Sequence, residues 1–254
     1  MNILIMLMYD GTGYHGFQRQ KNGITVQETL EKAVEKITGE KSCVLGCGRT
    51  DAGVHAVNYG ATFKSNTKIP LDKLPFALNS ALPDDIRVTE AYAVSDDFHP
   101  VFSLTGKTYR YKILNRKIDD VFLRNYAWFY PYELDVKKMR EAAAHFLGRH
   151  DFSGFMATGS NVKTTVRTIK RLDIEECGDG QINIYASADG FLYNMVRIIT
   201  GTLVAVGGGK IQPSEIPDII KSCDRTRAGA TAPPQGLSLY NIEYSEEDTG
   251  GQNY

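Results

Sequence analysis

The sequence predicts an α+β fold, built from two similar halves with mostly antiparallel sheets flanked by helices. Apolar runs of strand length alternate with amphipathic segments at helical spacing. The expected elements follow the order strand, helix, strands in both halves, and a further helix closes the second half. We expect the halves to comprise residues 1–103 and 104–246, followed by an acidic, polar tail at 247–254 that we expect to be disordered.

The first half is expected to begin with a buried strand and an amphipathic helix. Residues 2–8 are apolar without interruption, which is typical of a central strand covered on both faces. Residues 26–38 carry apolar side chains at helical spacing, and Thr25 with Glu28 forms a capping-box pattern at their start. The remaining elements expected here are strands at 43–47 and 59–63 and a helix at 71–82.

The second half is expected to begin with a strand at 107–114. Its alternation places Tyr109 and Tyr111 on one face and Arg110 and Lys112 on the other. The other elements expected here are a helix capped by Asp135 with Phe146 and Leu147 on its core face, strands at 166–176 and 182–188, an apolar helix at 191–206 that stops at three glycines, and a helix at 214–222.

The composition is that of a globular chain with nearly balanced charge. Its 254 residues are 42% hydrophobic, and 29 lysines and arginines nearly cancel 30 aspartates and glutamates. This length is sufficient for one large domain or two smaller ones, each with a core. No apolar run is long enough to cross a bilayer, and no basic segment precedes the first apolar run. We therefore expect neither a membrane span nor a signal peptide.

The four cysteines, Cys43, Cys47, Cys177 and Cys223, fit neither a disulfide framework nor a zinc site. We therefore expect a reducing, cytoplasmic location. Two acid-free basic segments favour a polyanionic partner, since 106–117 carries five basic residues and 161–171 carries four.

Two motifs with well-known chemistry are excluded by their neighbours. YDGT at 9–12 lacks the nucleophilic aspartate of haloacid-dehalogenase phosphatases, because Met8 occupies that position. GGGK at 207–210 ends an expected helix, whereas a phosphate-binding loop precedes one. Neither motif therefore indicates phosphoryl transfer or a nucleotide site.

The segment GCGRTDAGVHA at 46–56 places Arg49, Thr50 and Asp51 among glycines between two expected strands. By residue type alone, Asp51 followed by Ala-Gly is typical of a turn. Arg49 adds a positive field that favours an ionised carboxylate at position 51.

The same segment resembles the surroundings of the catalytic aspartate in the tRNA pseudouridine synthase A (TruA) family. Four further segments resemble the family in the same order, and the resemblance extends from residue 3 to about 244. They are YDGTGYHGFQRQ at 9–20, KTYRYKI at 107–113, FLYNMVRIITGTLVAVGGGK at 191–210 and APPQGLSL at 232–239. The sequence departs from the family at Pro100–Val101, where relatives carry Ala-Arg, so a phosphate contact from that side chain is expected to be missing.

The resemblance implies the pseudouridine synthase fold and an isomerase that converts uridine to pseudouridine at positions 38, 39 and 40 in the tRNA anticodon stem-loop. The bond between N1 and C1′ breaks, the uracil turns, and C5 bonds to C1′, so the reaction needs no cofactor and no metal. Asp51 is expected to be the catalytic carboxylate. It acts either as a nucleophile at C1′ or as a base at C2′, and both routes stay open.

The resemblance also implies binding roles and partners. Tyr109 is expected to stack on the flipped-out uracil, Arg197 to pair with Asp51, and Arg49 to fill the vacated stack or hold a phosphate. Relatives of this type are homodimers, so we expect a homodimer that binds tRNA. The alternative is a non-catalytic RNA-binding module on the same fold, which the presence of Asp51, Tyr109 and Arg197 argues against.

Overall fold

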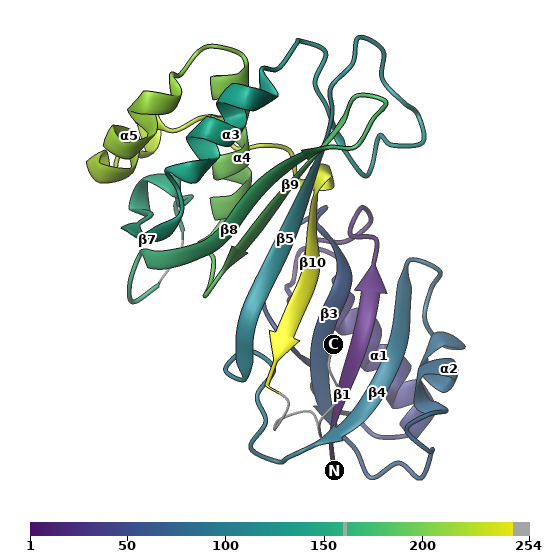
Figure 1. Ribbon diagram of the computed structural model, residues 1–254. Helices are drawn as coiled ribbons and strands as arrows, with labels where there is room; N and C mark the ends of the chain where they lie inside the picture. The colour runs from purple at the N-terminus through teal and green to yellow at the C-terminus, as the bar shows by residue number, and fades with distance from the viewer. Residues whose placement is uncertain (160–161, 246–254) are drawn as a thin grey trace. The chain divides into compact units, whose positions relative to one another are not determined.

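The computed structural model describes residues 1–159 and 162–245, and these form two compact units (Figure 1). The first unit comprises residues 1–107 together with 238–245, and the second comprises 108–237. The division at residue 103 stays a prediction, and in the structure the last strand belongs with the N-terminal unit. The predicted tail at 247–254 lies outside the described residues.

The first unit is a sheet with helices packed on it. The strands run in the order β4, β1, β3, β10, β5, and β2 adds to β3. Pairing with β1 is antiparallel on both sides, whereas β10 runs parallel to β3. The elements are β1 (Asn2–Tyr9), α1 (Val26–Thr38), β2 (Leu45–Gly46), β3 (His55–Lys64), α2 (Leu74–Asn79), β4 (Ile86–Val94), the start of β5 (Leu104–Leu114) and β10 (Leu237–Tyr244).

Strand β1 is the buried centre predicted for this unit. Its residues Ile3–Leu7 are at most 2% exposed, which confirms a strand covered on both faces. Full burial of one such side chain stabilises the fold by about 1.5–3 kcal/mol. The strand therefore forms a rigid platform, and the chain leaves it at Tyr9 to enter the Gly-rich turn.

Helix α1 occupies the predicted residues 26–38. The Thr25 hydroxyl accepts from the Glu28 backbone N–H at 3.3 Å, and Gly39 ends the helix at a φ of 75°. The Glu28 carboxylate pairs with Lys32 at 2.7 Å. The cap from Thr25 is thus confirmed, and the helix buries the apolar face that the sequence predicts.

The second unit is also a mostly antiparallel sheet with helices packed against it (Figure 1). Its strands run in the order β5, β9, β8, β7, and β6 pairs with β5. The elements beyond β5 are β6 (Trp128–Phe129), α3 (Val136–Ala144), β7 (Gly148–Asp151), β8 (Val166–Glu176), β9 (Gln181–Ala188), α4 (Met195–Gly207) and α5 (Ile216–Ser222), with single 3-10 turns at Ser153–Phe155, Pro213–Glu215, Arg225–Arg227 and Pro234–Gly236. The predicted α+β class is confirmed.

Several predicted boundaries are wrong for local reasons. The helix expected at 191–206 begins only at Met195, because Asn194 adopts a left-handed φ of 61° that interrupts the preceding turn. The helix expected at 71–82 shrinks to Leu74–Asn79, and the strand expected at 43–47 to Leu45–Gly46. Leu147 lies beyond the end of α3 and is 43% exposed, so it does not belong to the core.

Strands β4, β6, β7 and β10 were not predicted. Strand β4 lies at the edge of its sheet and mixes exposed with buried positions, so its sequence lacks a continuous apolar run. Strands β6 and β7 are too short for a periodic pattern. In the described part of the chain, every helix is too short or too polar to span a bilayer.

Candidate active site

Asp51 lies in the irregular segment between β2 and β3 and is half-buried. The chain reverses immediately after it, since the Val54 N–H donates to the Asp51 carbonyl oxygen at 3.1 Å. Gly53 takes a φ of 76°, which a side chain would disfavour. The turn predicted from residue type and the candidate catalytic position are therefore the same feature.

The backbone that leads into Asp51 is held by hydrogen bonds from other elements. The Cys47 carbonyl accepts from Lys107 Nζ at 2.6 Å, and the Gly48 carbonyl accepts from the Tyr59 hydroxyl. The Thr50 carbonyl accepts from the Phe17 N–H at 3.3 Å. Three carbonyl groups in four residues are thus satisfied by groups distant in sequence, which fixes the path of an irregular segment.

The Gly-rich turn that follows β1 packs directly against this segment. A methyl group placed on Gly11 would overlap the Val54 carbonyl, and one placed on Gly16 would overlap the Thr50 carbonyl. The Tyr9 and Thr50 hydroxyls also bond to each other at 2.8 Å. The motifs at 9–20 and 46–56 therefore pack against each other through their backbones. Positions 11 and 16 require glycine because a side chain would not fit.

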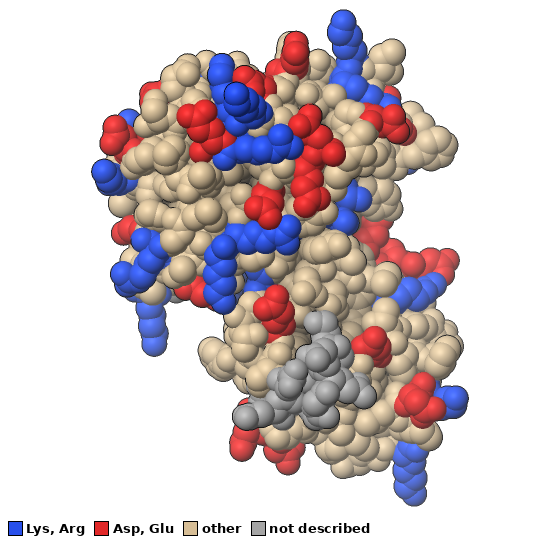
Figure 2. All heavy atoms as spheres, in the orientation of Figure 1, with Lys and Arg blue, Asp and Glu red and all other residues tan. Residues whose placement is uncertain are grey.

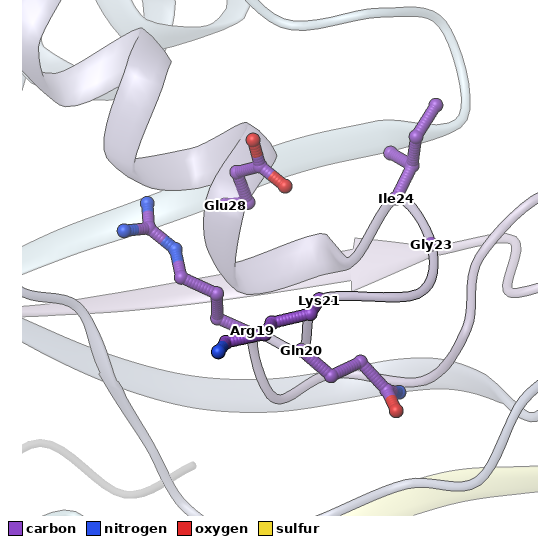
Figure 3. Close-up of a pocket in the computed structure, with 6 residues that line it drawn as sticks. All are labelled: Arg19, Gln20, Lys21, Gly23, Ile24 and Glu28. Carbon is purple, nitrogen blue, oxygen red and sulfur yellow. The ribbon is translucent and has the colours of Figure 1, made fainter.

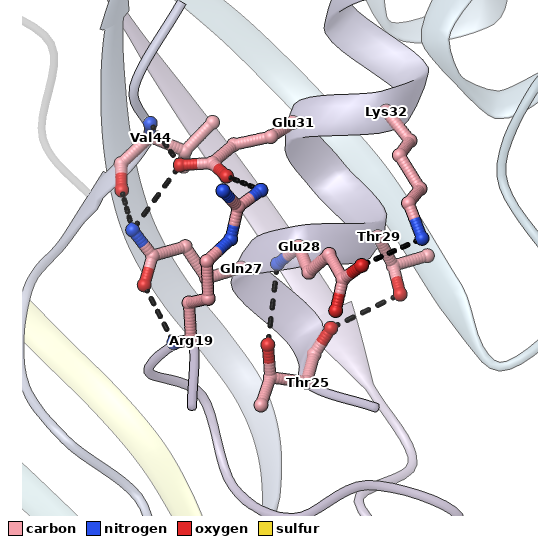
Figure 4. A network of polar contacts seen from close by, with 8 residues as sticks. All are labelled: Arg19, Thr25, Gln27, Glu28, Thr29, Glu31, Lys32 and Val44. Atoms are coloured by element: carbon pink, nitrogen blue, oxygen red, sulfur yellow. Dashed lines mark hydrogen bonds and ion pairs between the residues drawn. The ribbon is translucent and has the colours of Figure 1, made fainter. Parts of the chain in front are cut away.

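A polar network on helix α1 ties the end of the Gly-rich segment and Val44, the residue before β2, to the helix (Figure 4). Glu31 pairs with the Arg19 guanidinium and accepts from the Val44 N–H at 3.1 Å. Gln27 accepts from the Arg19 N–H at 2.8 Å and donates to the Val44 carbonyl at 3.0 Å. Neighbouring turns of one helix thereby hold the end of the Gly-rich segment close to the residue that leads into β2.

A pocket of about 620 Å³ lies beside this network, but it does not contain Asp51 (Figure 3). It is lined by Arg19, Gln20, Lys21, Gly23, Ile24 and Glu28. Cationic and anionic side chains both line it, and it is open to solvent. Because Asp51 does not line this pocket, we do not assign the pocket to the reaction expected of the carboxylate.

Burial perturbs two groups beneath the Asp51 segment. It lowers the pKa of the Lys107 ammonium, an effect that the neighbouring Cys47 thiol opposes. It also raises the pKa of the Cys47 thiol to about 11. The Cys47 side chain therefore stays protonated at neutral pH and is a packing residue. In the described residues no group of three His, Cys, Asp or Glu side chains is arranged to hold a metal ion.

Arg197 lies in the first turn of α4, in the second unit, and is half-buried. Its Nε donates to the Ala232 carbonyl at 2.8 Å, and its Nη1 donates to Asn194 Oδ1 at 2.7 Å. The Ala232 N–H in turn donates to the Arg197 carbonyl at 3.1 Å. This arginine is therefore oriented by local contacts and does not simply extend into solvent.

The motifs of the second unit meet around α4 and β5. A methyl group on Gly201 would overlap the Ala230 carbonyl, so α4 contacts the backbone of the segment before APPQGLSL. The Tyr111 hydroxyl donates to the Pro233 carbonyl at 2.7 Å. Tyr109 is half-buried, and its ring meets Phe191 edge-on with centroids 5.1 Å apart.

The predicted basic segments are only partly available to a polyanion. Arg116 pairs with Asp120 at 2.9 Å, and Arg171 pairs with Asp173 at 2.5 Å. On the face drawn in Figure 2, basic and acidic side chains are intermixed over the surface. Arg49, in contrast, is exposed on the Asp51 segment itself.

A family model described as tRNA pseudouridine synthase matches residues 5–103 and 142–245. The chain belongs to the tRNA pseudouridine synthase family. It is 55% identical to tRNA pseudouridine synthase A of Thermoanaerobacter sp. (strain X514) and 50% identical to the protein of the same name from Caldicellulosiruptor bescii. Each comparison covers 96% of this chain and 99% of the relative.

Within this family match, Asp51 and Arg197 fall in the two matched ranges, and Tyr109 lies between them. The structure places Asp51 and Arg49 on one segment of the first unit, and Tyr109 and Arg197 in the second unit. Sequence reasoning missed Lys107 and Tyr59 as contacts of the Asp51 segment. No local pattern indicates them, because Lys107 lies 60 residues from Cys47 and Tyr59 lies 11 residues from Gly48, and each occupies an ordinary strand.

Proposed function

We propose that this protein converts uridine to pseudouridine at positions 38, 39 and 40 in the anticodon stem-loop of tRNA, with Asp51 as the catalytic carboxylate. It is an isomerase of the tRNA pseudouridine synthase family. The single observation that carries the assignment of Asp51 is its place on a half-buried turn whose backbone is held by Lys107, Tyr59 and Phe17.

A carboxylate on a fixed turn suits the chemistry of this isomerisation. The N1–C1′ bond breaks and the uracil rotates, after which C5 bonds to C1′ and the C5 proton leaves. Asp51 either attacks C1′ or removes the C2′ proton, and both routes require the carboxylate to point at one ribose carbon. Fixing the backbone before and after Asp51 limits the directions that its side chain can take.

We infer supporting roles for three further residues. Tyr109 stacks on the flipped-out uracil, and its edge contact with Phe191 limits the orientations of the ring. Arg197 pairs with Asp51, and its hydrogen bonds to Ala232 and Asn194 limit its rotamers. Arg49, exposed on the Asp51 segment, fills the vacated stack or holds a phosphate.

The assembly and location follow from the same proposal. We infer a homodimer that binds tRNA, acting in the cytoplasm, where its substrate resides. Sedimentation of the purified protein, alone and with tRNA, measures the assembly. A monomer at micromolar concentration in both samples contradicts the homodimer.

One assay tests the activity and its sites together. The purified protein is incubated with unmodified tRNA that carries uridine at 38, 39 and 40, and pseudouridine is mapped by position. The control is the same tRNA with cytidine at those positions. We expect product in the first tRNA at these positions and none in the control. Product elsewhere contradicts the substrate site, and no product with retained binding favours a non-catalytic RNA-binding module.

A further inference from the structure

The carbonyl groups of Cys47 and Gly48 lie just after β2 ends, in the approach to Asp51. Each accepts a hydrogen bond from a side chain of another strand, the first from Lys107 on β5 and the second from Tyr59 on β3. The Lys107 bond is 2.6 Å long, which is short for a charge-assisted contact. Two consecutive peptide groups are thus fixed from the side of the sheet.

The surroundings leave little freedom for either donor. A methyl group on Gly48 would lie 2.8 Å from Lys107 Nζ, so the ammonium rests directly on the backbone. The Tyr59 ring is fully buried and stacks on Phe17 with centroids 4.5 Å apart. Both donors are therefore packed closely against the segment that they contact.

Lysine at position 107 has a cost that calls for a compensating role. Burial lowers the pKa of its ammonium, because the charged form is separated from water. A neutral side chain at position 107 would avoid the cost of burying a charge. It would not provide a cationic donor for the Cys47 carbonyl. The contact with the Cys47 carbonyl is thus the feature that accounts for the burial of the Lys107 ammonium.

We propose that Lys107 and Tyr59 are positioning residues for Asp51, which they orient by clamping the Cys47 and Gly48 carbonyls that precede it. The inference rests on the proposed function, since it takes Asp51 as the catalytic group. Neither residue needs to contact RNA. They raise the rate of the chemical step by orienting the backbone that carries Asp51. Other surfaces of the protein bind the tRNA, so these two residues do not contribute to its affinity.

The test measures single-turnover pseudouridine formation and the tRNA dissociation constant for Lys107→Met and Tyr59→Phe. Lys107→Met removes the ammonium and keeps the chain length, and Tyr59→Phe removes one hydroxyl and keeps the stacked ring. The matched controls are Lys64→Met at the exposed end of β3 and Tyr92→Phe on the edge strand β4. Lys107→Arg tests whether a cationic donor restores the rate.

We expect Lys107→Met to lower the single-turnover rate by about 100-fold, as a small misplacement of a catalytic group does. Tyr59→Phe is expected to lower it by about 10-fold, since a neutral donor contributes less than a charged one. Dissociation constants should stay within about 2-fold, Lys107→Arg should recover part of the rate, and both controls should match the parent.

An unchanged rate in both variants overturns the proposal, as does weaker tRNA binding at an unchanged rate, which would make Lys107 a phosphate contact. If Lys107→Met does not fold, Tyr59→Phe and Lys107→Arg still decide the question. Failure of the proposed function is distinguishable, because the parent protein itself would then make no pseudouridine.

Discussion

Asp51 and Arg197 are held by different means, although both are candidate site residues next to glycine-mediated backbone contacts. Asp51 lies in irregular backbone whose carbonyls are satisfied by Lys107, Tyr59 and Phe17. Arg197 lies in a regular helix turn and is oriented by Asn194, three residues earlier, and by Ala232. An irregular segment needs donors from many elements, whereas a helix supplies most of its own order.

The contrast has consequences for mutation. The Asp51 segment receives hydrogen bonds from β3, β5 and the Gly-rich turn, so removal of one donor leaves the others in place. The Arg197 side chain provides the donors of its bonds to Ala232 and Asn194. A substitution of Arg197 therefore removes both of these bonds at once, whereas a substitution of one donor around Asp51 removes one bond of several.

The largest effect is expected for Asp51→Asn and Asp51→Ala. Both remove the candidate nucleophile or base, so the single-turnover rate should fall by about 1,000-fold or more. The tRNA dissociation constant should change by a few-fold at most, because phosphate contacts dominate affinity. Asp97→Asn, an exposed position in the same unit, serves as the control. Substantial turnover by Asp51→Ala, in a preparation free of host enzyme, contradicts the assignment.

Arg197→Lys should come next, with a fall of about 100-fold in single-turnover rate. Lysine keeps the charge but lacks the planar guanidinium, whose several N–H groups can bond to the Ala232 carbonyl, the Asn194 side chain and a carboxylate at the same time. Arg197→Met should be slower still, since the charge is lost as well. Arg149→Lys on β7 is the matched exposed control. Parent-like rates for both Arg197 variants would show that its role is confined to packing of α4.

Gly11→Ala and Gly201→Ala compare the close backbone contacts of the two units directly. Each methyl group would overlap a carbonyl, of Val54 and Ala230 respectively. We expect each variant to lose about 1–3 kcal/mol of unfolding free energy, the usual cost of overpacking. Gly13→Ala faces open space and should stay within about 0.5 kcal/mol of the parent. Chemical denaturation measures all three, and equal stabilities would mean that these contacts relax without cost.

Tyr109→Phe and Tyr109→Leu separate the ring from its hydroxyl. Phenylalanine keeps the edge contact with Phe191 and the stacking face, so tRNA binding should be normal. If the hydroxyl helps to remove the C5 proton, this variant should stall after glycosidic cleavage. Leucine should also weaken capture of the base, by about 1–3 kcal/mol. Binding and single-turnover assays on the stem-loop distinguish these outcomes, and parent-like behaviour of both variants would make Tyr109 a scaffold residue.

The smallest effect is expected for Asn194→Gly. Glycine accepts the left-handed φ of 61° at this position, so α4 should begin where it does now. The variant loses the bond from Arg197 to the Asn194 side chain and keeps the bond from the guanidinium to the Ala232 carbonyl. We expect a rate decrease of about 3- to 10-fold, in line with the loss of one hydrogen bond. A decrease as large as that of Arg197→Met would show that Asn194 is the dominant contact.

Local chemistry made a large part of the fold predictable. The uninterrupted apolar run of β1, the capped and periodic helix α1, and the paired strands β8 and β9 were all predicted, since their signals lie within a few residues. The sequence motifs also predicted the family, and the match over most of the chain confirms it. Edge strand β4 escaped prediction because its pattern depends on which neighbours cover it.

The sequence by itself determined the main elements, the family and the identity of Asp51 as a candidate. Only the tertiary structure decided what holds that residue. Lys107 counts in the sequence as one of five basic residues that favour a polyanion, yet it donates to the Cys47 carbonyl, 60 residues away. Gly11 and Gly16 resemble ordinary turn glycines, yet their lack of side chains makes room for the Asp51 segment. Periodicity and capping act over three or four residues, whereas an irregular segment is fixed by donors and spaces that folding brings to it.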